Sequence, residues 1–150
     1  MCQKRREGRA LSRDWKDMRF KYRYLRDASA SGRDYIRLPL LQVRLGSATN
    51  RTDVVGLVDT GATDCLFDRD VADALGITLA DSDVTREYFG VGGQSVIGHI
   101  HLIRFQIQGF SEWVEIEVGF IDTKLPYQLL GQSGFFDNYE ISFQALSGKV

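Results

Sequence analysis

A single acidic side chain stands where a predicted buried strand runs into a turn. The segment 53–68 reads DVVGLVDTGATDCLFD, and Asp59 is followed directly by Thr60, Gly61 and Ala62. One interpretation is structural, because an aspartate at a strand end can accept hydrogen bonds from the next backbone N–H groups and close an Asx-turn. The other is chemical, because a carboxylate held in this way can take up and return a proton.

Together with two later segments, this run resembles the retropepsin-like aspartic proteases, and their small prokaryotic members more than the viral ones. EYFGVGGQSVIGHIHL at 87–102 resembles the mobile flap hairpin. LLGQSGFFDNYEISF at 129–143 resembles the apolar-apolar-Gly segment, here with Leu130 and Gly131 as support for the active site, and the short helix behind the catalytic loop. The resemblance covers about residues 35–146. It implies an all-β, closed β-barrel-like fold with one or two short helices.

The resemblance also gives roles to the residues at the turn. Asp59 would be the catalytic acid and base toward a water nucleophile. Thr60 would hydrogen-bond across a dimer, and Gly61 would let the backbone approach the carboxylates closely. Ala62 has no hydroxyl to donate to an ionised carboxylate, whereas a serine would have one, so we expect activity nearer neutral pH than in a Ser-bearing relative.

Substrate binding is expected from two further places. The chain departs from the viral pattern at Thr63, where an acidic residue commonly holds the substrate backbone, and we expect Asp64 to take that role. Gly92 and Gly93 fall at the expected flap tip, where a positive φ costs little. A plain hairpin turn is the alternative interpretation of this glycine pair.

The implied chemistry needs two carboxylates that share one proton, because like charges about 3 Å apart cannot both ionise. The chain has one Asp-Thr-Gly triplet. A twofold homodimer would supply the second carboxylate, so each chain would be half of a symmetric dimer. The function implied is an aspartic endopeptidase that acts on peptide or protein substrates. The alternative is a catalytically weak or inactive dimeric peptide-binding module with the same fold.

We expect no cofactor and no metal. His99 and His101 share one face of a predicted strand, but only Cys65 could join them as a soft ligand within the domain. Cys65 lies beside Leu66 and Phe67, which favours a small buried hydrophobe over a nucleophile.

Short strand-like runs separated by turn residues predict the all-β fold. One helix is predicted after the catalytic segment, with Asp68 as its N-cap and Gly76 as its left-handed stop. From Met18 the pattern RFKYRYL predicts a half-buried edge strand with its aromatic side chains inward; a nucleic-acid surface is the alternative. The predicted strand runs are 35–45, 53–58, 86–91, 95–107, 112–121 and 139–145.

Charge divides the chain into two parts. Of its 150 residues, 1–33 carry 11 Lys/Arg and 4 Asp/Glu, whereas 34–150 carry 8 and 16, so a net charge of +7 precedes one of −8. We therefore expect a basic, partly disordered N-terminal extension over 1–33 and the retropepsin-like aspartic protease domain over 34–150. A nucleic-acid partner is not expected beyond this basic leader. Because no long apolar run is present and disulfides are not needed at this size, we expect no membrane association and a cytoplasmic location.

Overall fold

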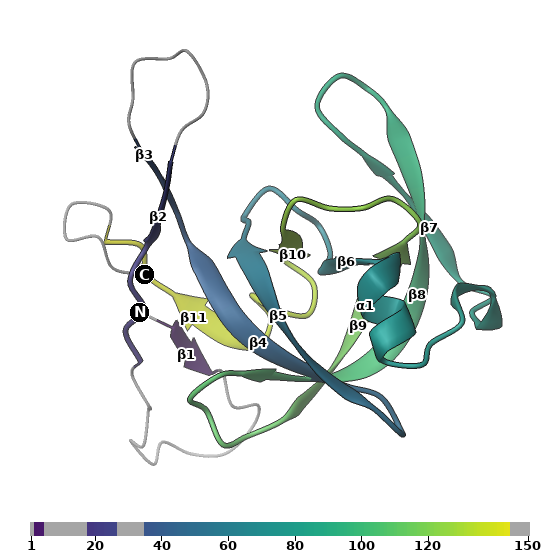
Figure 1. Cartoon of the computed structure of the whole chain (residues 1–150), viewed down its shortest axis with the longest axis horizontal. Helices are drawn as coiled ribbons and strands as arrows, with labels where there is room; N and C mark the ends of the chain where they lie inside the picture. Colours follow the sequence, from purple (N-terminus) through teal and green to yellow (C-terminus); the bar gives the residue numbers. More distant parts are fainter. Residues whose placement is uncertain (1, 5–17, 27–34, 145–150) are drawn as a thin grey trace.

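The computed structural model describes residues 2–4, 18–26 and 35–144 (Figure 1). Nearly all of the regular structure is strand. The elements in chain order are β1 (Cys2–Lys4), β2 (Arg23–Arg26), β3 (Tyr35–Leu38), β4 (Leu40–Gly46), β5 (Arg51–Val58), β6 (Leu66–Asp68), helix α1 (Arg69–Ala74), the 3₁₀ turn η1 (Leu79–Asp81), β7 (Thr85–Phe89), β8 (Ser95–Ile107), β9 (Val114–Ile121), β10 (Gln128–Leu130) and β11 (Tyr139–Ile141).

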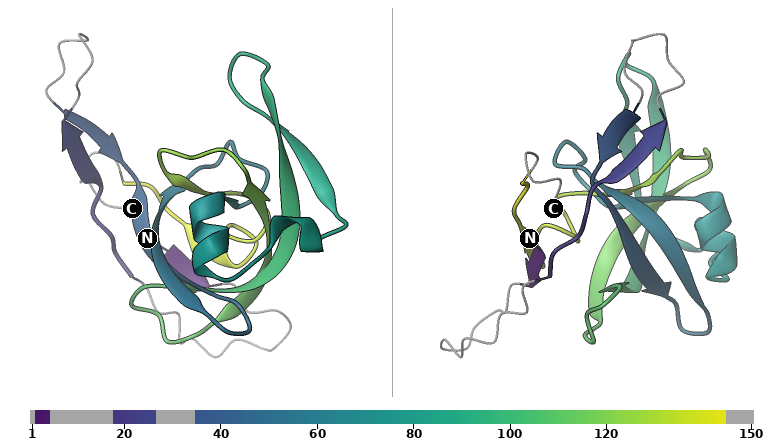
Figure 2. Two further views of the ribbon diagram at one scale, coloured as in Figure 1. Left: turned by 45° about the vertical axis from the view of Figure 1, so that its right-hand side comes forward. Right: turned by 60° about the vertical axis from the view of Figure 1, so that its left-hand side comes forward.

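Within the described residues, six strands are hydrogen-bonded in a closed ring. The order is β4, β5, β10, β6, β9 and β8, and β8 pairs back onto β4. The β5–β10 and β6–β9 pairs are parallel, and the other pairs are antiparallel. The strands curve around one another in both views of Figure 2. The predicted all-β, closed arrangement is confirmed.

The long strand β8 explains why one hairpin leaves this ring. Its last residues pair with β4, whereas residues Ser95 to His99 pair along the same edge with β7. The β7–β8 hairpin therefore extends beyond the ring, on the side at which β5 ends (Figure 1).

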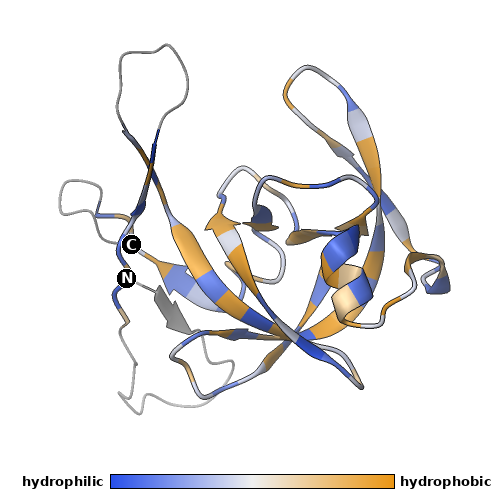
Figure 3. Cartoon of the chain, in the orientation of Figure 1, coloured by the Kyte–Doolittle hydropathy of each residue, from blue (hydrophilic) through white to orange (hydrophobic). Residues whose placement is uncertain are grey.

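The core lies inside the ring because strand side chains alternate between its two faces. Figure 3 shows this alternation of hydrophobic and hydrophilic residues along β4 and β5. Four aromatic rings pack together at one part of the core, with centroids 5.4–6.1 Å apart. They belong to Phe105, Phe110, Phe135 and Tyr139.

The helix forms where the sequence predicts it. The Asp68 carboxylate accepts a hydrogen bond from the Val71 N–H at 3.3 Å, as an N-cap should. Gly76 has φ +68°, a conformation that glycine adopts without a Cβ clash. With α1 and η1, the prediction of one or two short helices is confirmed. No helix in the described part of the chain is long and apolar enough to cross a membrane.

Three local predictions are wrong. The segment after Leu130 and Gly131 forms successive turns up to Tyr139 rather than a helix. The strand predicted from Met18 is regular only over β2, which pairs with β3, and Tyr24 is 60% exposed instead of facing inward. The three-residue strands β6 and β10 were not predicted as strands, because so short a run shows no period.

The N-terminal extension is not wholly separate from the domain. Met18 and Phe20, although both fall in the basic leader, pack against the core. Strand β1 pairs with β11. The domain boundary expected near residue 33 stays a prediction.

The Asp68 carboxylate yields a stability prediction. It is buried and accepts hydrogen bonds from Leu125 N at 3.3 Å and Gln128 Nε2 at 3.0 Å, besides capping α1. Asp68→Ala should lower the free energy of unfolding by about 2 kcal/mol or more, because it removes a cap and leaves buried donors unpaired. Urea denaturation measures this loss. Asp70→Ala, at an exposed side chain in the same helix, is the control, and an equal loss there would contradict the prediction.

Candidate active site

Asp59 lies directly after β5, at the point where β5 runs parallel to β10. Its N–H donates to the Leu130 carbonyl at 3.1 Å, which continues the pairing of the two strands by one residue. One carboxylate oxygen, Oδ1, accepts a hydrogen bond from the Gly61 N–H at 2.8 Å. The side chain is half-buried, whereas Thr60 and Gly61 are exposed. The turn therefore fixes the carboxylate while its next two residues face outward.

The residues after β10 hold the other side of this loop. Gln132 donates from Nε2 to the Thr60 carbonyl at 2.8 Å and from its backbone N–H to the Ala62 carbonyl at 2.9 Å. Ser133 donates to the Thr63 carbonyl at 2.8 Å. Residues 60–63 are thus supported by backbone and amide donors from 132–133.

Gly131 makes this contact possible because it has no side chain. A Cβ atom placed on Gly131 would fall within 2.8 Å of the Ala62 carbonyl oxygen and still closer to the Asp64 carbonyl. Both obstacles are backbone, which cannot turn aside. Leu130 is fully buried, and its side chain occupies the space next to Gly56, where a Cβ would come within 2.7 Å. The predicted supporting pair Leu130 and Gly131 is therefore brought against the loop of Asp59.

Asp64, which was expected to bind substrate, has partners within the chain, and its role toward substrate stays a prediction. Its side chain is 6% exposed, and both carboxylate oxygens accept hydrogen bonds from Arg86 Nη1, at 2.8 and 2.9 Å. Tyr88 donates from its hydroxyl to Oδ2 at 2.7 Å. This carboxylate is thus directed toward β7.

The electrostatics of these three groups are consistent with one another. Burial, followed by the hydrogen bond to the Asp64 carboxylate, raises the pKa of Tyr88 well above its ordinary value, so the hydroxyl keeps its proton. The hydrogen bond to Asp64 and its negative charge also raise the pKa of Arg86. Tyr88 and Arg86 were not predicted as site residues. The available signal was weak, since only their i, i+2 spacing on one strand face hinted at a common partner.

The predicted flap residues lie at the tip of the β7–β8 hairpin. Gly92 and Gly93 have φ +100° and +78°, so a left-handed backbone is needed at both positions. Large apolar side chains around the tip are exposed, with Phe89 at 72% and Val91 and Ile97 also open to solvent. The hairpin itself is confirmed.

The soft ligands do not converge on a metal site. His101 Nε2 lies 3.3 Å from the Leu79 carbonyl, and His99 is half-buried on the same strand. Within the described residues, no group of three or more His, Cys, Asp or Glu side chains is placed to hold a metal ion. Cys65 is fully buried, and burial raises its pKa to about 12, so it stays a neutral thiol.

The chain matches a known protein family over most of the described strands. A family model described as aspartyl protease matches residues 41–133, which is more than half of the chain, so the chain belongs to the aspartyl protease family. The resemblance to aspartic proteases drawn from the sequence is confirmed by this match. No curated protein matches the chain in sequence.

Two solved structures are similar to the chain. One is described as the EIAV protease complexed with the inhibitor HBY-793, with 22% identity and a TM-score of 0.45, over 63% of this chain and 82% of that chain. The other is described as a retropepsin-like aspartic protease from Rickettsia conorii, with 21% identity and a TM-score of 0.46, over 61% of this chain and 73% of that chain.

Gly131 provides a test of the loop packing. Gly131→Ala should lower the free energy of unfolding by about 2–3 kcal/mol, because the added methyl overlaps two backbone carbonyls. Urea denaturation measures the change. Gly90→Ala is the matched control, since a Cβ there would meet nothing closer than 3.8 Å. Equal stability of the two variants would contradict the packing described.

Cys65 should be unreactive in the folded protein. In a Cys2→Ser variant, a thiol reagent at pH 8 should label Cys65 only after denaturation, because the native thiol is buried and protonated. Since its pKa rises from 9.0 to about 12 on folding, the stability linked to the neutral thiol is present below pH 9 and is lost as the pH rises toward 12. Rapid labelling of the native protein would contradict this.

Proposed function

We propose that the chain is an aspartic endopeptidase that is active as a homodimer, with one Asp59 from each subunit. The observation that carries the proposal is the half-buried Asp59 carboxylate, fixed by the Gly61 N–H at 2.8 Å and followed by two exposed residues. This loop presents its acid at a surface that a second copy could meet.

The need for a second copy follows from the chemistry of the pair. A single carboxylate cannot act as base toward a water and as acid toward the peptide carbonyl in one step. Asp64 is near in sequence, but its carboxylate is buried and bound by Arg86 and Tyr88. The second carboxylate is therefore supplied by a twofold partner, so that two identical groups face each other across the symmetry axis.

In the proposed mechanism, the two Asp59 carboxylates share one proton. The ionised group takes a proton from a water between them, that water attacks the carbonyl carbon of the scissile peptide, and the protonated group donates to the carbonyl oxygen. The resulting tetrahedral diol breaks down when the carboxyl group that took the water proton gives it to the amide nitrogen, which leaves as an amine. The other carboxylate takes a proton back from a diol hydroxyl, so the C=O bond re-forms and the pair again shares one proton. Thr60, exposed beside the acid, has a hydroxyl that can hydrogen-bond across the dimer.

The substrate is an extended peptide segment covered by the β7–β8 hairpin. Gly92 and Gly93 at the tip permit the bending that admits a chain, and the exposed apolar side chains Phe89 and Val91 favour contact with apolar residues. Closure of the hairpin over the peptide would exclude bulk water from the carboxylates.

Replacing the acid tests this function. Asp59→Asn should reduce cleavage of a mixed peptide library by about a thousandfold or more while leaving the fold intact, because one amide replaces each acid of the pair. The unaltered protein should be inhibited by a transition-state mimic of peptide hydrolysis. Asp53→Asn, at an exposed position on the same strand, is the control and should retain activity.

Mixing subunits tests the dimer separately. When the unaltered chain is mixed with Asp59→Asn at constant total concentration, activity should fall as the square of the unaltered fraction, because only dimers with two acids act. A linear fall would mean that each chain acts alone. Absence of any inhibitor-sensitive cleavage from acid to neutral pH, in protein whose solution mass is dimeric, would favour a peptide-binding module.

A further inference from the structure

We infer that Asp64, Arg86 and Tyr88 are positioning residues that fasten the base of the β7–β8 hairpin to the loop of Asp59. The inference rests on the proposed function, because it concerns how that hairpin is held over the acid. We call these three residues the hairpin anchor.

The contacts of the anchor are short and buried at one end. The Asp64 carboxylate, 6% exposed, accepts three hydrogen bonds of 2.7–2.9 Å, two from Arg86 Nη1 and one from the Tyr88 hydroxyl. Arg86 Nη2 also lies 3.8 Å from Glu117 on β9. A buried carboxylate is tolerated only when such partners replace its lost water. The buried Asp64 carboxylate therefore needs the donors of β7, and its hydrogen bonds hold β7 in place.

Two glycines form a slot through which Tyr88 reaches this carboxylate. A Cβ on Gly98 of β8 would come within 2.5 Å of the Tyr88 ring, and a Cβ on Gly119 of β9 would come within 2.8 Å of its hydroxyl. Any side chain at either position would displace the ring. The tyrosine thus lies across two neighbouring strands, and its hydroxyl ends at the segment that follows the Asp59 loop.

The anchor lies between the hairpin and the segment that follows the Asp59 loop. On one side, Tyr88 precedes the glycine pair at the tip by only a few residues and pairs with Val96 across the hairpin. On the other side, the Asp64 backbone packs against Gly131, the residue whose neighbours support the Asp59 loop. One cluster therefore links the covering element to the catalytic loop through two short paths.

Holding the hairpin in advance lowers the cost of binding a peptide. If only a fraction of the molecules has the base of the hairpin in the position that receives a peptide, the apparent affinity falls by that fraction. Once the peptide is enclosed, the carboxylates and the water are unchanged. Loss of the anchor is therefore expected to raise KM while kcat changes little.

The test uses the full chain and two readouts. Tyr88→Phe removes one hydroxyl and keeps the ring in its slot, whereas Asp64→Asn removes the charge that Arg86 binds. In the free protein, amide hydrogen exchange within residues 85–99 should become about tenfold faster in both variants, with β4 and β5 unchanged. In peptide cleavage, KM should rise about 3- to 10-fold and kcat should stay within about twofold.

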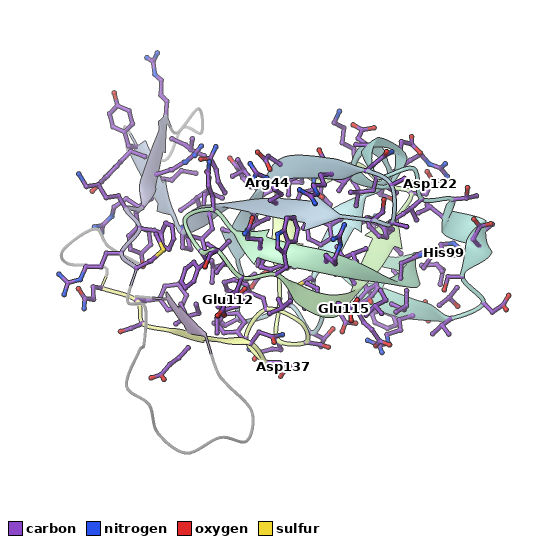
Figure 4. The ribbon with its side chains drawn as sticks, turned by 90° about the horizontal axis from the view of Figure 1, so that it is seen from below. Arg44, His99, Glu112, Glu115, Asp122 and Asp137 are labelled. Atoms are coloured by element: carbon purple, nitrogen blue, oxygen red, sulfur yellow. The ribbon has the colours of Figure 1, made fainter. Side chains whose placement is uncertain are left out.

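The matched control is a second arginine–aspartate pair outside the hairpin. Arg44 Nε and Nη2 donate to the two oxygens of Asp53 at 2.6 and 3.0 Å, on β4 and β5. Figure 4 shows Arg44 well apart from His99, which lies on the hairpin strand β8. Asp53→Asn breaks this pair and should alter neither the exchange within 85–99 nor KM.

The outcomes separate the anchor from the proposed function. The inference would be overturned if amide exchange within residues 85–99 were as slow in Tyr88→Phe as in the unaltered protein. It would also be overturned if exchange became faster to the same degree in all strands. A fall in kcat without a rise in KM would also overturn it. If the unaltered protein cleaves no peptide, the proposed function fails, but the exchange measurement still decides whether the hairpin is fastened. If Asp64→Asn does not fold, Tyr88→Phe alone decides.

Discussion

The site depends on one close approach, in which the backbone of residues 62–64 lies directly against Gly131. At this position the parallel pair β5–β10 ends and the two following segments must cross without room for a single methyl group. Because neither backbone can move aside, the contact fixes the position of the Asp59 loop relative to β10. The donors of Gln132 and Ser133 then find the Thr60, Ala62 and Thr63 carbonyls already in reach. The position of Asp59 thus depends on the absence of a side chain at Gly131, which follows the neighbouring strand β10.

The same crossing makes Asp64 buried, and burial of a carboxylate has its own consequences. The charge must be met by donors, and those available come from β7, which belongs to the outermost hairpin. Once Arg86 and Tyr88 meet it, the hairpin is no longer free to pivot at its base. Because the buried Asp64 carboxylate needs donors, it binds two residues that lie 22 and 24 positions later in the chain. These hydrogen bonds link the segment after the Asp59 loop to β7.

Local signals in the sequence predicted those features that depend on neighbouring residues. Asp68 and Gly76 bracket α1, and Gly92 and Gly93 mark the hairpin tip, because caps and tight turns are specified within a few residues. The place of Asp59 followed from a triplet and its apolar run. Strands β6 and β10 were missed because three residues carry no period. The partners of Asp64 were not predicted, because the i, i+2 spacing of Arg86 and Tyr88 does not show which distant group they contact. Asp64 was expected to hold substrate because it follows Thr63, where the viral pattern commonly has an acidic residue. Tyr24 was expected to be buried, since alternation alone cannot tell which face of an isolated β2–β3 pair meets the core.

Glycine serves two different physical purposes around the Asp59 loop. At Gly92 and Gly93 it permits a left-handed backbone, so the hairpin tip can bend. At Gly98, Gly119 and Gly131 the backbone is ordinary and only the missing Cβ matters, since a side chain or a second backbone fills that space. The first kind gives the hairpin tip a backbone conformation that residues with a side chain rarely adopt. The second kind fixes the base of the hairpin and the loop of Asp59. Backbone freedom is therefore expected at the tip, whereas the carboxylate that the proposed dimer would pair with its twofold mate lies in a loop held by close packing.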